Sequence, residues 1–61
     1  MNQEIKPGTL LADKTMPELT GLVIEVNHQY NQPFKILCED QILRCDLDYI
    51  LEHCDVISNT P

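Results

Sequence analysis

The stretch GLVIEVNHQYNQPFKILCED, residues 21–40, decides the fold because it holds two short apolar runs joined by a polar segment. The first run is rich in β-branched residues, which favour a strand over a helix at this length. Alternation places three of its side chains on one face: Leu22, Ile24 and Val26. The second run alternates in the same way, with these side chains on one face: Phe34, Ile36 and Cys38. The stretch therefore predicts a β-hairpin.

Shorter apolar runs on either side of this hairpin predict further strands. Before it, the turn pair Pro7-Gly8 leads into an apolar run at residues 10–12, and a loop containing Pro17 follows at residues 14–19. After it, the segment ILRCDL alternates and predicts a strand with these side chains inward: Leu43, Cys45 and Leu47. We therefore expect a sheet of four or five short strands, and bending that sheet protects its edges.

The segment DLDYILEHCDVI, residues 46–57, allows two interpretations. Its apolar residues recur at the spacing of one helix face, with Asp46 as a candidate N-cap, which predicts two helical turns. The alternative is a single 3₁₀ turn around LDYI followed by a strand at EHCDVI. We favour the turn followed by a strand, because so short a helix depends on tertiary packing.

The order of these segments resembles the SH3-like small barrel, and in particular the tiny single-domain versions common in bacteriophage genomes. Four segments carry the resemblance: residues 8–11, 21–26, 34–40 and 51–57. It implies an all-β fold, a small and strongly bent barrel of about five short strands with one short helical turn near the C-terminus. We expect one domain over residues 1–61, with loose termini at 1–6 and 58–61.

Two departures from the family pattern concern the third strand and the hairpin turn that follows it. The tryptophan often found in the third strand is absent, and Cys38 occupies the comparable place. The usual Asp-Gly turn is replaced by Asp40-Gln41, which lacks a residue suited to positive φ. Both departures bear on the register of this hairpin.

The charge balance indicates which partners the chain can attract. Ten acidic residues stand against four basic ones, a formal net charge of −6, and the basic residues are scattered singly. The second half of the chain holds a group of acids: Glu39, Asp40, Asp46, Asp48, Glu52 and Asp55. Such a distribution repels nucleic acid and anionic membranes and attracts a basic partner, although acids also simply keep small domains soluble.

The three cysteines and the N-terminal sequence bear on the compartment. The start MNQEIKPG lacks the apolar segment of a signal peptide, and no run approaches the length of a membrane span. Three cysteines cannot all pair with one another. We therefore expect reduced thiols in a cytoplasmic protein.

Residues that could carry chemistry have unfavourable spacing. The thiols and the two histidines lack the C-x₂-C spacing typical of structural zinc sites, so we expect no metal and no other cofactor. A thiol nucleophile needs a base or positive charge nearby, whereas most neighbours here are acids, which raise a thiol pKa. The paired carboxylates Glu39–Asp40 and Asp46–Asp48 lie in segments expected to be solvated. We predict that the protein is not an enzyme.

The remaining candidate site is a binding surface. Tyr30 and Tyr49 are suited to a partly exposed recognition patch, because tyrosine is favoured where one end stays wet. With the acids they form the candidate set: Tyr30, Tyr49, Glu39, Asp40, Asp46 and Asp48. In many small barrels such tyrosines only cap the core.

Three functions compete on this basis. The first is a non-enzymatic protein-interaction module, phage-encoded by the resemblance, that docks a protein partner through an acidic face or a sheet edge. The second is a nucleic-acid-associated barrel resembling the short module of transcription and ribosomal factors, on the strength of TGLVIEV; the net charge makes direct nucleic-acid contact a poor fit. The third is an enzyme or metal protein. We also expect self-association through a sheet edge, because a domain this small is marginally stable alone.

Overall fold

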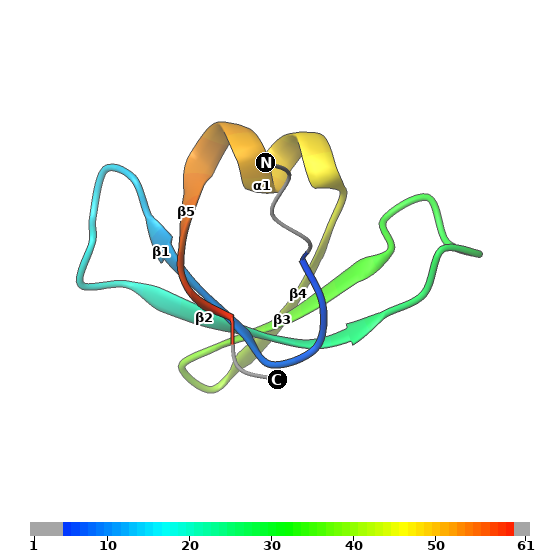
Figure 1. Ribbon diagram of the computed structural model, residues 1–61. Coiled ribbons are helices and arrows are strands. Elements are labelled where there is room, and N and C mark those ends of the chain that lie inside the picture. Colours follow the sequence, from blue (N-terminus) through cyan, green and yellow to red (C-terminus); the bar gives the residue numbers. More distant parts are fainter. Residues whose placement is uncertain (1–4, 60–61) are drawn as a thin grey trace.

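The computed structural model describes residues 5–59, which form five β-strands and one short helix. The elements follow the chain in this order: β1 (Thr9–Asp13), β2 (Thr20–Val26), β3 (Phe34–Cys38), β4 (Gln41–Cys45), α1 (Leu47–His53) and β5 (Cys54–Asn59). Figure 1 shows a strongly curved sheet with the helix lying over its hollow side. The predicted all-β architecture of about five short strands is confirmed.

The strands form one antiparallel sheet in the order β4-β3-β2-β1-β5. β4 and β5 are its two edges, and α1 connects them along the chain. The two edges do not pair, so the sheet is open rather than a closed barrel. In Figure 1 this leaves α1 spanning the gap between the end of β4 and the start of β5.

The core lies on the concave face of the sheet, beneath α1. Val23, Phe34 and Ile36 supply it from the two central strands, and Ile50 closes it from the helix. Ile5, which precedes β1, is also buried in this cluster. Because α1 covers only part of the concave face, the core is small, as expected for a chain of this length.

A β-bulge in β2 changes which of its side chains reach the core. The pairing with β3 shifts register between Val23 and Glu25, so β2 has one extra residue there. Val23 is fully buried, whereas Leu22 and Ile24 are exposed and Val26 packs against the core. The predicted common face of Leu22, Ile24 and Val26 is therefore wrong, because the bulge interrupts the alternation.

The C-terminal segment is a two-turn helix followed directly by a strand. Asp46 has an extended backbone, and its carboxylate accepts a hydrogen bond from the Tyr49 N–H at 2.8 Å, as an N-cap should. The favoured single 3₁₀ turn is therefore too short, and the closing strand begins at Cys54 rather than Glu52. At seven residues, α1 is far too short to cross a membrane, and residues 5–59 hold no helix that could.

Two side chains near α1 that were predicted to lie inward are exposed in the structure. Cys45 points into the core as expected, but Leu43 and Leu47 are exposed. Leu43 is paired with the buried Ile36 and lies on the concave face as predicted, but the open sheet leaves it uncovered. Leu47 belongs to the helix rather than to a continuing strand. The strand ends at Cys45 because the Asp46 cap starts the helix there.

The termini were predicted to be loose over residues 1–6 and 58–61, but the structure places residues 5, 6 and 58 in ordered contacts. Ile5 is buried in the core, and the backbone N–H of Lys6 donates to the Thr9 hydroxyl at 3.1 Å. Ser58 pairs with Leu10 as part of β5. Residues 1–4 and 60–61 lie outside the part of the chain that the structure describes.

Candidate binding groove

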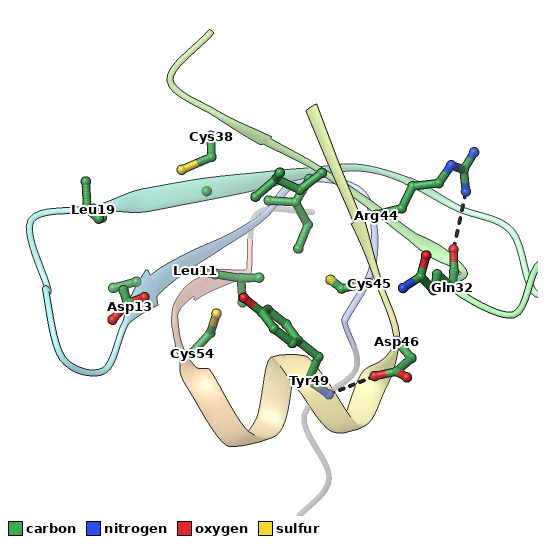
Figure 2. A pocket seen from close by; sticks show the side chains of 14 residues that line it. Leu11, Asp13, Leu19, Gln32, Cys38, Arg44, Cys45, Asp46, Tyr49 and Cys54 are labelled. Atoms are coloured by element: carbon green, nitrogen blue, oxygen red, sulfur yellow. Dashed lines mark hydrogen bonds between the residues drawn. The ribbon is translucent and has the colours of Figure 1, made fainter. Parts of the chain in front are cut away.

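The open side of the sheet forms a groove of about 480 Å³. β4 contributes one wall through Leu43 and Cys45, and α1 contributes Tyr49. The opposite wall comes from Asp13 and Cys54, where β1 and β5 pair. Figure 2 shows these side chains arranged around a common space. The groove therefore lies where the sheet fails to close.

The floor of the groove is apolar. Leu11 and Ile36 reach it from β1 and β3, and each also belongs to the buried core. Gly21 of β2 lies between these two strands, and a Cβ placed on it would come within 2.7 Å of Ile36 Cγ2. The floor thus depends on a residue without a side chain, because any larger residue would displace Ile36.

All three cysteines line the groove as free thiols: Cys38, Cys45 and Cys54. Burial, helped by Cys54 and Asp46, raises the pKa of Cys45 to about 11. Burial also raises the pKa of Cys54, and the carboxylates of Asp13 and Asp55 add to this effect. The predicted direction is confirmed for these two thiols. They are protonated at neutral pH and act there as small apolar groups rather than nucleophiles.

The rim of the groove carries two carboxylates held in fixed positions. Asp13 accepts hydrogen bonds from the Thr15 hydroxyl at 2.7 Å, from the Thr15 N–H at 2.8 Å and from the Met16 N–H at 3.0 Å. These bonds, the hydroxyl first, lower the pKa of Asp13, so this carboxylate is ionised at neutral pH. Asp46 stands at the other end, where it caps α1.

Two of the candidate residues lie in this groove. Tyr49 extends from α1 toward Leu11 in Figure 2. The centre of its ring lies 4.5 Å from the centre of the His53 ring. Asp46 lines the rim beside it. Asp48 is exposed in the first turn of α1, next to the groove in sequence but not among the residues that line it.

The other three candidate residues lie elsewhere. Tyr30 is exposed in the loop between β2 and β3, with the Arg44 guanidinium stacked 4.4 Å from the centre of its ring. Glu39 and Asp40 form the turn between β3 and β4. That turn is separated from Asp46 by the length of β4, about 20 Å at the usual rise per residue. The predicted acidic surface is therefore two separate groups.

Some residues of the groove were not among the sequence candidates. Arg44 and Gln32 form one end of it, where the guanidinium donates to the Gln32 backbone carbonyl at 3.3 Å, as Figure 2 shows. Leu19 lies at the other end, in the loop before β2. None of the three stands out in the sequence, because their proximity results from the pairing of distant strands.

The groove offers no preformed metal centre. Among residues 5–59, no three side chains of the ligand-forming types His, Cys, Asp and Glu are placed to hold an ion together. The groove combines an apolar floor, protonated thiols and two fixed negative charges on the rim.

Comparisons of the chain with protein-family models, with curated protein sequences and with solved structures found no significant match.

Proposed function

We propose that the protein is a non-enzymatic interaction module that docks a protein partner in the groove between β4, α1 and the β1–β5 end of the sheet. The partner presents an apolar side chain to the floor and basic side chains to the rim. The single observation that carries this proposal is the groove itself, in which an apolar floor lies between the carboxylates of Asp13 and Asp46.

The apolar floor supports a docked side chain rather than a reacting substrate. Leu11, Ile36 and the protonated thiols can release water when an apolar group covers them, which supplies binding energy without specific polar contacts. Tyr49 adds an aromatic wall that is half exposed, and such residues are enriched in the centres of protein interfaces.

The rim supports a basic partner. Asp13 and Asp46 are fixed by hydrogen bonds, and α1 adds the exposed Asp48 and Glu52. The nearby Lys14 uses its ammonium group to donate to the Leu51 carbonyl at 3.0 Å. A lysine- or arginine-bearing segment is therefore attracted to this side of the molecule.

The architecture supports an SH3-like small barrel as the proposed fold family. The resemblance implies about five short strands with one short helical turn near the C-terminus, and the five antiparallel strands with α1 before the last of them are consistent with it. The open gap is then the position at which such a barrel would close. The resemblance to small phage-encoded proteins remains part of the same proposal.

A titration with two synthetic peptides tests the docking function. One peptide has a Leu-Phe-Leu centre flanked by two lysines on each side, and the other has glutamates in place of the lysines. Amide chemical shifts are followed by NMR. We expect the basic peptide to shift the resonances of Leu11, Tyr49 and Cys54, to bind more weakly in about 1 M salt and to outcompete the acidic peptide.

Matched variants locate the binding site. Tyr49→Ala and Tyr30→Ala remove tyrosines of almost equal exposure, 52% and 53%, but only Tyr49 lines the groove. We expect Tyr49→Ala to weaken binding at least fivefold and Tyr30→Ala to leave it unchanged. Equal effects of the two substitutions would place binding elsewhere and contradict the proposal.

A second pair of variants tests the charge of the rim. Asp13→Asn with Asp46→Asn removes two negative charges but keeps an oxygen acceptor for the loop and the cap. Glu39→Gln with Asp40→Asn removes two charges at the distant turn. The first double variant should lose affinity for the basic peptide. Tight binding of single-stranded RNA at physiological salt would instead favour the nucleic-acid alternative.

A further inference from the structure

The edge strand β4 is regular and has one side without a neighbouring strand in the part of the chain that the structure describes. Its five residues pair with β3 without a register shift, and within residues 5–59 it has a strand neighbour on that side only. β5, the other edge, is protected by a register shift opposite Leu10 and Leu11 and carries Asp55. Bulges and charges are common devices that prevent edge pairing. β4 has no bulge, and its one charged residue, Arg44, is stacked on the ring of Tyr30.

The hairpin turn sets which main-chain groups of β4 point to the free edge. Cys38 pairs with Gln41 across the turn, so the Gln41 N–H is directed at β3, as in a hydrogen-bonded β-turn. Hydrogen-bonding direction alternates along an antiparallel strand. The N–H and C=O groups of Ile42 and Arg44 are therefore directed away from β3, toward the open edge.

The side chains of the outer face continue an apolar row up to this edge. The strand registers place the following residues opposite one another in turn, from β1 to β4: Leu10, Leu22, Leu37 and Ile42. The row becomes more exposed toward the edge, and Ile42 is 58% exposed. Adding a strand beside β4 would extend the row, because cross-strand apolar pairs stabilise a sheet.

We propose that a second copy of this chain covers the edge, with the two β4 strands antiparallel and Ile42 facing Ile42 across a twofold axis. This register joins the two apolar rows into one. It also directs the outward main-chain groups of both strands at each other. The self-complementary arrangement is the isologous type that closes as a dimer.

Charge selects this register over its neighbour. With Ile42 at the axis, Arg44 of each copy lies opposite Asp40 of the other, which places two opposite-charge pairs across the interface. With Leu43 at the axis instead, Asp40 lies opposite Asp46, which places like charges together. The interface shares β4 with the groove, whose lining includes Leu43 and Arg44, but Ile42 at the axis is not among the lining residues.

Sedimentation velocity of the full chain tests the proposal, from about 1 µM to about 1 mM. The interface is small, so we expect a weak dimer with a dissociation constant on the order of 10 µM. Ile42→Lys should abolish the dimer, because two lysines then meet at the axis. Ile57→Lys is the matched control, since Ile57 is 54% exposed on β5. Monomer at every concentration, or a dimer lost only with Ile57→Lys, would overturn the proposal.

A charge exchange tests the register with less risk to folding. Asp40→Arg and Arg44→Asp each create two like-charge pairs and should raise the dissociation constant roughly tenfold. The double variant Asp40→Arg with Arg44→Asp restores two opposite-charge pairs and should dimerise like the original chain. Failure of the double variant to recover dimerisation would rule out this register.

Discussion

Both faces of the sheet carry apolar side chains, but those beneath α1 on the concave face are buried and most of those on the outer face are exposed. On the concave face, Val23 and Ile36 are buried beneath α1. On the outer face, Leu22, Leu37 and Ile42 stand directly opposite one another and remain exposed. Period-two alternation reveals that a strand has two faces, but with apolar residues on both it does not show which face the core covers. In this protein the position of α1 determines which face of the sheet becomes the core.

The largest expected difference between the two faces concerns two neighbouring residues of β3. Ile36 is 7% exposed on the concave face, and Leu37 is 37% exposed on the outer face. We expect Ile36→Ala to lower the free energy of unfolding by about 3 kcal/mol, because it removes buried methylene groups and leaves a cavity. Leu37→Ala should cost less than about 1 kcal/mol. Urea denaturation at low protein concentration measures both.

The result can contradict the assignment of the faces in a simple way. Equal losses for the two variants would mean that the outer face is covered as well, in the monomer or by another molecule. Repeating the Leu37→Ala measurement at high protein concentration separates these cases, because cover by a second copy depends on concentration.

The sequence was sufficient for the strands but not for their faces. The apolar runs predict β1 to β4 within a residue or two, and Asp46 marks the start of α1. The bulge after Val23 was not predictable, because residues 23–26, VIEV, form an ordinary strand-like sequence in which no glycine or proline marks the extra position. Helix and strand also compete in residues 47–54, where both patterns fit.

The candidate site was predictable only in its local parts. Asp46 and Tyr49 lie in the groove, and a cap next to an amphipathic turn is visible in the sequence. Tyr30, Glu39 and Asp40 lie outside the groove. The sequence did not predict this, because position along a chain does not reveal which end of a strand a residue occupies in space. Likewise, the cysteines meet only through the pairing of distant strands.

Alkaline pH provides the second test, because Cys45 lies on the concave face. Its folded pKa of about 11 stands above the ordinary value of 9.0, so the folded state favours the neutral thiol. The resulting stability is complete below pH 9 and is lost as the pH rises toward 11. We expect a loss of about 2–3 kcal/mol over this range.

The matched control for this test is Cys45→Ala. Other groups also titrate above pH 9, so the relevant quantity is the difference between the two proteins in urea denaturation under reducing conditions. Cys45→Ala should be less stable at pH 8, but it should lose less stability as the pH rises. Parallel pH profiles would show that Cys45 is not protected by the concave face.

Gly21 gives a smaller effect from the same face. A Cβ at this position would meet Ile36 Cγ2 at 2.7 Å, so Gly21→Ala forces a buried side chain to move. We expect a loss of about 1–2 kcal/mol in the free energy of unfolding. Combining it with Ile36→Val separates the two sides of the contact, since the Cγ2 methyl remains and the loss should persist. A stabilised Gly21→Ala variant would contradict the tight floor.

The turn that joins β3 to β4 gives the smallest effect and changes neither face. Among the residues that the structure describes, Glu39 is the one other than glycine with positive φ, at 58°. Glycine adopts this conformation without steric cost, but it also gives the unfolded chain more conformational freedom, which opposes folding. The net effect of Glu39→Gly should be a gain of about 0.5–1 kcal/mol in the free energy of unfolding. Glu39→Gln removes the same charge but keeps the strain, so it should leave the thermal midpoint nearly unchanged. Asp40→Gly should lower it, because Asp40 does not share the positive φ. If both glycine variants lowered the midpoint equally, the turn would not have the geometry that directs Ile42 and Arg44 to the open edge.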